Sequence, residues 1–379
     1  MQESSRNIWE ERIADLRRYD LDMLDTAPMD PAQLTSWPVP SLTFARIDGV
    51  LRSWDIEREK QQQSQQQPQQ GQDPNQVPKR MYLMEDALAG LHSQQAKVAF
   101  LVLGSKSGVN YYFGASLEPS LEGGNGSDSS STMLSFNAVR SVLNSVYNGV
   151  EISGEPFTQD MMKSMIASRA NHVGLITGIP ALKSTGGDTL ESEQIERLAN
   201  GLRGQDFGFL VLAVPIPKDK LMAEEFNVVD QIQRAQENED PEKKKRIKYY
   251  LELQDAYLKH IQLGAAVGSW LVGSYFFAPD RSVFARLQSL LQGTFVDETC
   301  RPTPLRTHAV KGLKSHIEQY GLLSNRRTEG LLGYKFLTPL NSRLLSAFIH
   351  LPKVKCRDSE FGGQRNSVWP IFHPKIRTG

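Results

Sequence analysis

The chain has 379 residues, of which 39% are hydrophobic and 23% charged, a balance typical of folded globular proteins that excludes a wholly disordered chain. Lysine and arginine together number 43, as do aspartate and glutamate, so no overall charge attracts nucleic acid or an anionic membrane, and any DNA contact must be local. Two cysteines are too few for a disulfide framework, and the seven histidines lack the HxxxH or HExxH spacing of zinc sites.

Residues 1–58 are predicted to begin with an amphipathic helix, because Trp9, Ile13 and Leu16 recur at helical spacing between charged positions. They contain no apolar core of the length of a secretion signal, and no stretch of the chain reaches the roughly 18 apolar residues of a membrane helix. We therefore expect a cytoplasmic protein without a membrane span. The glutamine-rich residues 59–79 are expected to be a linker or a loop insertion, with a weak interaction segment as the alternative.

Residues 80–300 are expected to form an α/β or α+β body in which helices cover a mixed sheet. Strands are predicted where side chains alternate or where an apolar run is continuous, near Val98, Tyr111, Gly174, Phe209 and Trp270. Helices are predicted from three-and-four apolar spacing at residues 82–92, 136–149, 191–202 and 282–291. Residues 104–108, Gly-Ser-Lys-Ser-Gly, are expected to be a tight hairpin turn and not a phosphate cradle.

A protruding helical hairpin is expected at about residues 219–263, with its two arms broken near Asp240 and Pro241. The second arm carries apolar side chains at a spacing that suits a hairpin or coiled-coil seam: Ile247, Tyr250, Leu251, Tyr257, Leu258 and Ile261. We favour packing of this stripe on its own domain over a partner helix.

Two basic groups are candidates for phosphate contacts. The first is the run at residues 243–246 with Lys248, beside which Tyr249 and Tyr250 could stack on bases. Acidic residues immediately precede this run, and such alternation of charge is typical of a solvated hairpin tip, which is the interpretation we favour. The second group, residues 311–314 with residues 326–327, is a weaker candidate.

The nearest approach to a phosphate-binding loop runs over residues 174–185. A functional loop needs Gly-x4-Gly-Lys-Ser/Thr, so that backbone amides surround the phosphate and the lysine reaches it. Here four residues separate Gly178 from Lys183, and Pro180 removes one amide donor. The sequence also has no Gly-x-Ser-x-Gly motif and no assignable carboxylate pair. We therefore expect no catalytic, cofactor-binding or metal-binding residues and no enzymatic activity in this chain.

Three segments of the body, residues 178–183, 197–204 and 207–213, carry a family pattern together with a helix-like run at residues 338–352. They resemble the N-terminal, non-motor region of HerA-like bacterial ATP-binding proteins of the FtsK/HerA superfamily, in which a run like 338–352 leads into the nucleotide-binding domain. The resemblance implies a scaffold without catalytic residues, a ring-forming homo-oligomer, a partner ATPase domain or subunit, and DNA reached through the assembled complex.

On this interpretation residues 301–379 are a small connector, and the chain is truncated or split before the phosphate loop of its motor. The alternative is a free-standing scaffold or interaction protein of a defence or secretion system that binds a separately encoded ATPase. A third possibility is an enzyme whose site is not recognised in the sequence.

Overall fold

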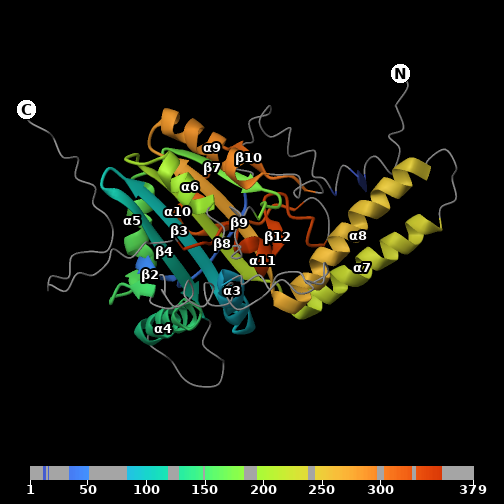
Figure 1. Cartoon of the computed structure of the whole chain (residues 1–379), viewed down its shortest axis with the longest axis horizontal. Helices are drawn as coiled ribbons and strands as arrows, with labels where there is room; N and C mark the ends of the chain where they lie inside the picture. The colour runs from blue at the N-terminus through green and yellow to red at the C-terminus, as the bar shows by residue number, and fades with distance from the viewer. Residues whose placement is uncertain are drawn as a thin grey trace, which may run out of the picture.

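The computed structural model describes residues 34–50, 83–117, 128–147, 150–182, 194–237, 244–296, 303–326 and 330–351, together with Arg12, Ile13 and Leu16. Within these ranges a ten-stranded sheet carries helices on both faces, and two long helices project from one end of it (Figure 1). Several predicted features lie outside the described residues: most of the N-terminal helix, residues 59–79, Lys183, both cysteines and residues 352–379.

Eight strands form the main path of the sheet, in the order β10 (Arg306–Ala309), β7 (His172–Thr177), β9 (Ser269–Ala278), β8 (Phe207–Pro215), β3 (Lys97–Ser105), β4 (Gly108–Ser116), β2 (Thr43–Val50) and β5 (Val150–Ile152). Two further strands join it beside this path: β12 (Thr338–Asn341) pairs with β9, and β6 (Phe157–Thr158) pairs with β2. A separate two-stranded sheet joins β1 (Ser36–Pro38) to β11 (Gly321–Leu323). All of these strand pairs are antiparallel, and one isolated parallel bridge joins Ile179 to Pro304.

The sheet has a hydrophobic core on each face, because successive side chains of a strand point to opposite sides. In β3, Phe100 belongs to one core and its neighbour Leu101 to the other, and both are fully buried, which contributes about 2–3 kcal/mol for each side chain. The first core is covered by α3 (Leu83–Ser93), α4 (Asp128–Val146), α6 (Gln194–Gly201), α9 (Arg281–Phe295) and α11 (Ser342–Leu345). The second is covered by α5 (Gln159–Ala167) and α10 (Lys314–Glu318), and the roots of the two long helices also reach it.

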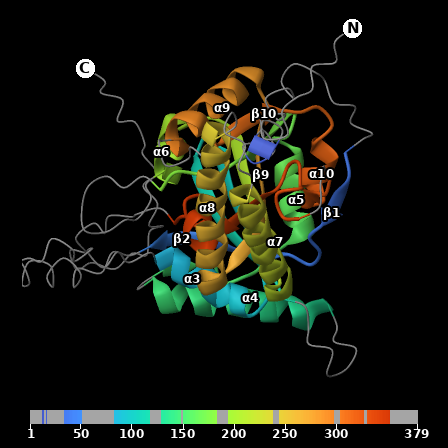
Figure 2. The same ribbon diagram turned by 90° about the vertical axis from the view of Figure 1, so that its right-hand side faces the viewer.

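The two long helices, α7 (Lys218–Gln236) and α8 (Lys244–Val267), form the predicted protruding hairpin (Figures 1 and 2). Its seam contains a polar layer in which Gln254 Nε2 donates to Gln231 Oε1 at 2.8 Å. Nearer the sheet, Glu224 accepts hydrogen bonds from Tyr257 Oη at 2.9 Å and from the backbone N–H of Leu331 at 3.2 Å. The hairpin is thus tied to the body as well as to itself. No helix among the described residues is long and apolar enough to cross a lipid bilayer.

The predicted class, an α/β or α+β fold with a helix-covered sheet and a protruding helical hairpin, is confirmed. The sheet was predicted to be mixed, but all of its strand pairs are antiparallel, which makes the fold α+β. The predicted turn at residues 104–108 is also present: Ser105 pairs with Gly108, so Lys106 and Ser107 form a two-residue loop between β3 and β4. Residues beyond 300 contribute β10 and β12 to the same sheet, so the predicted connector and the body share one core.

The expectation of a helix-like run at residues 338–352 is wrong for its first four residues. Residues 338–341 form β12, and the α-helical part is α11 alone. The reason lies in β9, whose half from Ser274 to Ala278 is paired with β7, whereas β12 pairs with the half from Ser269 to Val272. Pairing with this half of β9 provides backbone hydrogen bonds that outweigh local helix propensity.

Candidate functional site

Within the described part of the segment nearest to a phosphate loop, residues 174–182, three backbone amides donate hydrogen bonds to the protein. The N–H of Gly178 donates to Thr338 Oγ1 at 3.0 Å, that of Ile179 to the Thr303 carbonyl at 2.9 Å, and that of Ala181 to the Phe295 carbonyl at 2.9 Å. Gly178 has φ +94°, and a Cβ there would lie 2.3 Å from the Pro304 carbonyl oxygen. The glycine is therefore required by close backbone packing, and these amides do not form a phosphate-binding nest.

The two basic candidates differ in their surroundings. At the start of α8 the cationic side chains are exposed: Lys244, Lys245, Arg246 and Lys248. Tyr250 beside them is buried, and its Oη donates to Gln231 Oε1 at 2.9 Å, so of the tyrosine pair Tyr249 alone reaches the surface, where it is 37% exposed. In the second group, Arg326 donates to Tyr334 Oη at 2.7 Å and its guanidinium lies over the same ring.

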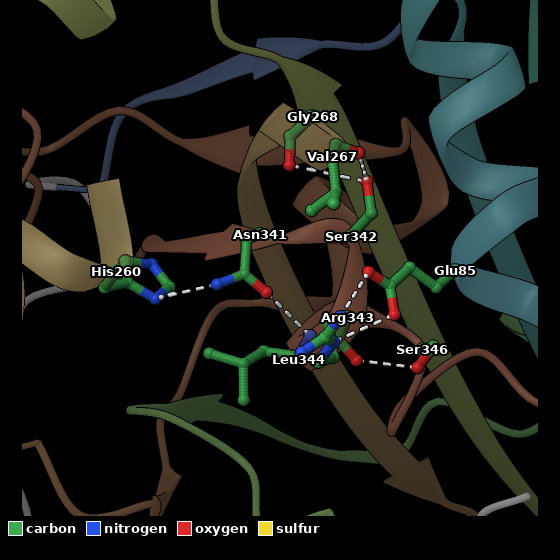
Figure 3. A network of polar contacts seen from close by, with 9 residues as sticks. All are labelled: Glu85, His260, Val267, Gly268, Asn341, Ser342, Arg343, Leu344 and Ser346. Carbon is green, nitrogen blue, oxygen red and sulfur yellow. Dashed lines mark hydrogen bonds and ion pairs between the residues drawn. The ribbon is translucent and has the colours of Figure 1, made fainter. Parts of the chain in front are cut away.

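Polar side chains converge where residues 338–346 meet the root of the hairpin and α3. We call it the root junction, and it consists of Glu85, His260, Asn341, Ser342 and Arg343 (Figure 3). Four of these five side chains belong to α8, to α11 or to the residue that caps α11, and Glu85 comes from α3. The junction therefore joins three elements that lie far apart in the sequence.

Asn341 connects the hairpin to α11. Its Oδ1 accepts the backbone N–H of Leu344 at 3.0 Å, as a helix N-cap does, and its Nδ2 lies 3.2 Å from His260 Nδ1. The His260 Nε2 lies 3.1 Å from the carbonyl oxygen of Pro339. One tautomer satisfies both contacts: Nε2–H donates to the carbonyl, and Nδ1 accepts from the amide.

Burial lowers the pKa of His260 to about 4, against a smaller opposing effect of the hydrogen bond to Pro339. The imidazole is therefore neutral at physiological pH. Because each ring nitrogen already has a protein partner, neither can accept a proton from a substrate or bind a metal ion without breaking the junction. His260 thus connects α8 to β12 through its two hydrogen bonds.

Ser342 fixes the end of α8. Its Oγ donates to the Val267 carbonyl at 2.6 Å and accepts the indole N–H of Trp270 at 2.9 Å, while its backbone N–H donates to the Gly268 carbonyl at 3.0 Å. Gly268 has φ +96°, and a Cβ at this position would lie 2.8 Å from the ring of His92 and 3.0 Å from Ser342 Oγ. A glycine at residue 268 thus lets the chain turn from α8 into β9 without backbone strain or a close contact with His92.

Arg343 connects α11 to α3 through an ion pair with both oxygens of Glu85. Nε donates to Oε2 at 2.9 Å and Nη2 to Oε1 at 3.2 Å. The Glu85 side chain is only 6% exposed, whereas that of Arg343 is 38% exposed. A carboxylate this deeply buried needs its partner, because an unpaired charge in the interior is strongly disfavoured.

The root junction is built to hold elements together. Its hydrogen bonds join its members to one another, to backbone groups and to the Trp270 indole, and the convergent set contains no side chain with the partners of an activated nucleophile or a general base. Among the described residues, no three side chains of the His, Cys, Asp and Glu types lie close enough together to hold a metal ion. The arrangement fixes α11 relative to α8 and α3.

No model of a known protein family matches the chain, and no curated protein matches it either. The interpretation of the root junction therefore depends on its own geometry and on the sequence pattern of residues 338–352.

Proposed function

We propose that this chain is the non-catalytic assembly and docking part of a HerA-like DNA-translocating ATPase, acting in the cytoplasm. Its motor domain would follow as a continuous domain or be supplied as a separate subunit. DNA would be contacted by the assembled ring, because the chain itself has 43 basic and 43 acidic residues.

One observation carries the proposal. The run at residues 338–351, whose sequence resembles the segment that leads into the motor of such ATPases, is fixed to three elements of the body at once. The root junction ties it to α8 and α3, and β12 ties it to the sheet. Its apolar side chains Leu345, Phe348, Ile349 and Leu351 belong to the core and are at most 2% exposed. A segment held in this way gives an attached domain a defined position relative to the hairpin.

The proposal is tested by purifying the tagged chain from its native host and determining the intact mass and the peptides of whatever accompanies it. We expect a polypeptide that contains a Gly-x4-Gly-Lys-Ser/Thr loop, in stoichiometric amount or continuous with this chain. If this polypeptide is a separate subunit, the chain is a free-standing scaffold that binds an ATPase. If it is continuous with the chain, the chain is the N-terminal part of a single protein. Recovery of the chain alone, at 42.5 kDa, would count against both.

A second experiment addresses activity within the chain itself. The purified chain is expected not to hydrolyse ATP. Hydrolysis that is lost in Lys183→Ala but kept in the control Lys106→Ala would defeat the proposal, because it would place a nucleotide site in the chain. Lys106 is a suitable control because it lies in the two-residue turn between β3 and β4.

A further inference from the structure

The outer half of the hairpin is packed against residues near the N-terminus. Ala235 near the end of α7 and Ile247 near the start of α8 are 0% and 6% exposed, and with Tyr250 they form a small apolar cluster of their own. Two helices side by side leave the groove between them open to water, so burial this complete needs a third element. The helical residues Ile13 and Leu16 provide it, because both pack on this cluster beside the outer half of α8 (Figures 1 and 2).

Leu16 also reaches the body. Its carbonyl oxygen accepts a long hydrogen bond from Thr303 Oγ1 at 3.5 Å, and the Thr303 carbonyl in turn accepts the backbone N–H of Ile179 just beyond β7. A cavity of about 50 Å³ lies between α8 and the body at this point, and it is lined by Leu16, by Leu253 and Ala256 of α8, and by Ile179 and Thr303 of the body. This volume exceeds the space of one water molecule, so α8 does not pack directly on the body here. Leu16 therefore bridges a gap between the hairpin and the body.

The inner half of the hairpin is held at its root, where Glu224 bonds to the body and His260 to Asn341. Ala235 lies eleven residues beyond Glu224, which is about 16 Å further along α7 at about 1.5 Å per residue. A rod that is held only at one end can turn about that end, whereas a second support away from the root fixes its direction. The contacts of the N-terminal residues with the outer cluster and with the body provide such a second support.

We infer that Ile13 and Leu16 form a brace that sets the angle between the hairpin and the body. With the brace in place the hairpin points in one direction, and without it the hairpin swings about its root as a rigid unit. Displacing the brace would therefore redirect the surface that the hairpin presents to a partner. This inference does not depend on the proposed function, since it requires neither an ATPase nor DNA.

Pulsed electron paramagnetic resonance on the full chain measures this angle as a distance between two spin labels. One label is attached at Gln236→Cys on the exposed end of α7 and the other at Arg286→Cys on the exposed side of α9, with both native cysteines replaced by serine. We expect a single narrow distance distribution in this parent protein. The brace variant Ile13→Asp/Leu16→Asp should widen the distribution at least about twofold, because carboxylates are disfavoured in an apolar contact and the brace detaches.

The matched control is Met133→Asp/Leu134→Asp on α4, which makes the same change at side chains that are 47% and 52% exposed and should leave the distribution as narrow as in the parent. A second label pair, Gln236→Cys with Lys259→Cys, lies within the hairpin and should stay narrow in the brace variant, because the hairpin moves as a unit. A brace variant as narrow as the parent, or a parent as broad as the brace variant, overturns the inference. Broadening within the hairpin also overturns it, because the N-terminal residues would then hold the two helices together without setting their angle to the body.

Discussion

The neutral state of His260 makes a quantitative prediction about stability and pH. The folded protein holds the pKa of this imidazole at about 4 by burial, whereas an unfolded chain has the ordinary value of about 6.5. Between these two values the unfolded chain binds a proton that the folded protein does not bind. The free energy of unfolding therefore falls as the pH is lowered from about 6.5 towards 4.

The magnitude follows from the two pKa values. At pH 5 the unfolded chain is protonated at this position and the folded chain is almost entirely neutral, which removes about 2 kcal/mol of stability relative to neutral pH. At pH 4 the loss grows to about 3 kcal/mol. Burial also lowers the pKa values of His92 and His316, so the wild type alone does not isolate the contribution of His260.

The substitution His260→Gln separates these contributions. A glutamine amide can donate to the Pro339 carbonyl and accept from Asn341 Nδ2, but it does not titrate. Urea unfolding of the wild type and the variant at pH 7.5 and pH 5 gives, for each protein, the loss of unfolding free energy between the two pH values. Subtracting the loss of the variant from that of the wild type cancels the contributions of His92 and His316, which both proteins share. We expect the variant to lose about 2 kcal/mol less than the wild type. Equal losses would refute the assignment of His260 as a buried, neutral bridge.

Three further predictions concern single side chains. Arg343→Met should lower the free energy of unfolding, measured with urea, by about 3–5 kcal/mol, because it leaves the Glu85 carboxylate buried without a partner. Glu85→Gln should lower it less, because the Arg343 side chain is 38% exposed. Equal losses in the two variants would contradict this difference. Gly268→Ala should lower the free energy of unfolding by about 1–3 kcal/mol, because residue 268 has a positive φ and the added Cβ would contact His92. The control is Gly293→Ala in α9, where an added Cβ meets nothing within 4 Å. This control should leave the free energy of unfolding unchanged or raise it by up to about 1 kcal/mol. Ile247→Asp should loosen the hairpin tip, because this side chain is 6% exposed in a cluster with Tyr250; unchanged helicity by circular dichroism and unchanged stability would count against the seam.

Elements of the fold that depend on local pattern could be predicted closely from the sequence. A strand is predicted near Phe209, and β8 runs from Phe207 to Pro215, because a strand buried on both faces needs a continuous apolar sequence. The hairpin was expected at residues 219–263 and spans α7 and α8, because helical seams repeat every three or four residues. By contrast, β12 has four residues, too few to show a period, and its strand conformation comes from pairing with β9.

The root junction could not be predicted, because its partners are distant in the sequence. Glu85 and Arg343 are 258 residues apart, and the ion pair between them leaves no periodic trace. One part did carry a local signal: Asn341 directly precedes a short run ending in two leucines, which is the pattern of a helix N-cap. The exposed Met222, Phe226 and Val229 of α7 also recur at helical spacing, but distinguishing them from the buried Leu221 and Val228 of the same helix requires the structure.

The position of β12 has a mechanical consequence. Once tension on the chain at Leu351 has detached residues 342–351 from the core, it acts on the end of β12, and its component along that strand loads the strand lengthwise. The hydrogen bonds between antiparallel strands run perpendicular to them, so such a pull loads the four residue pairs with β9 in shear, and they resist together instead of opening one after another. Because β9 is itself paired with β8 along most of its length, the load would spread into the middle of the sheet. A pull on the end of β12 is thus resisted by the sheet as a whole and not by a single strand pair.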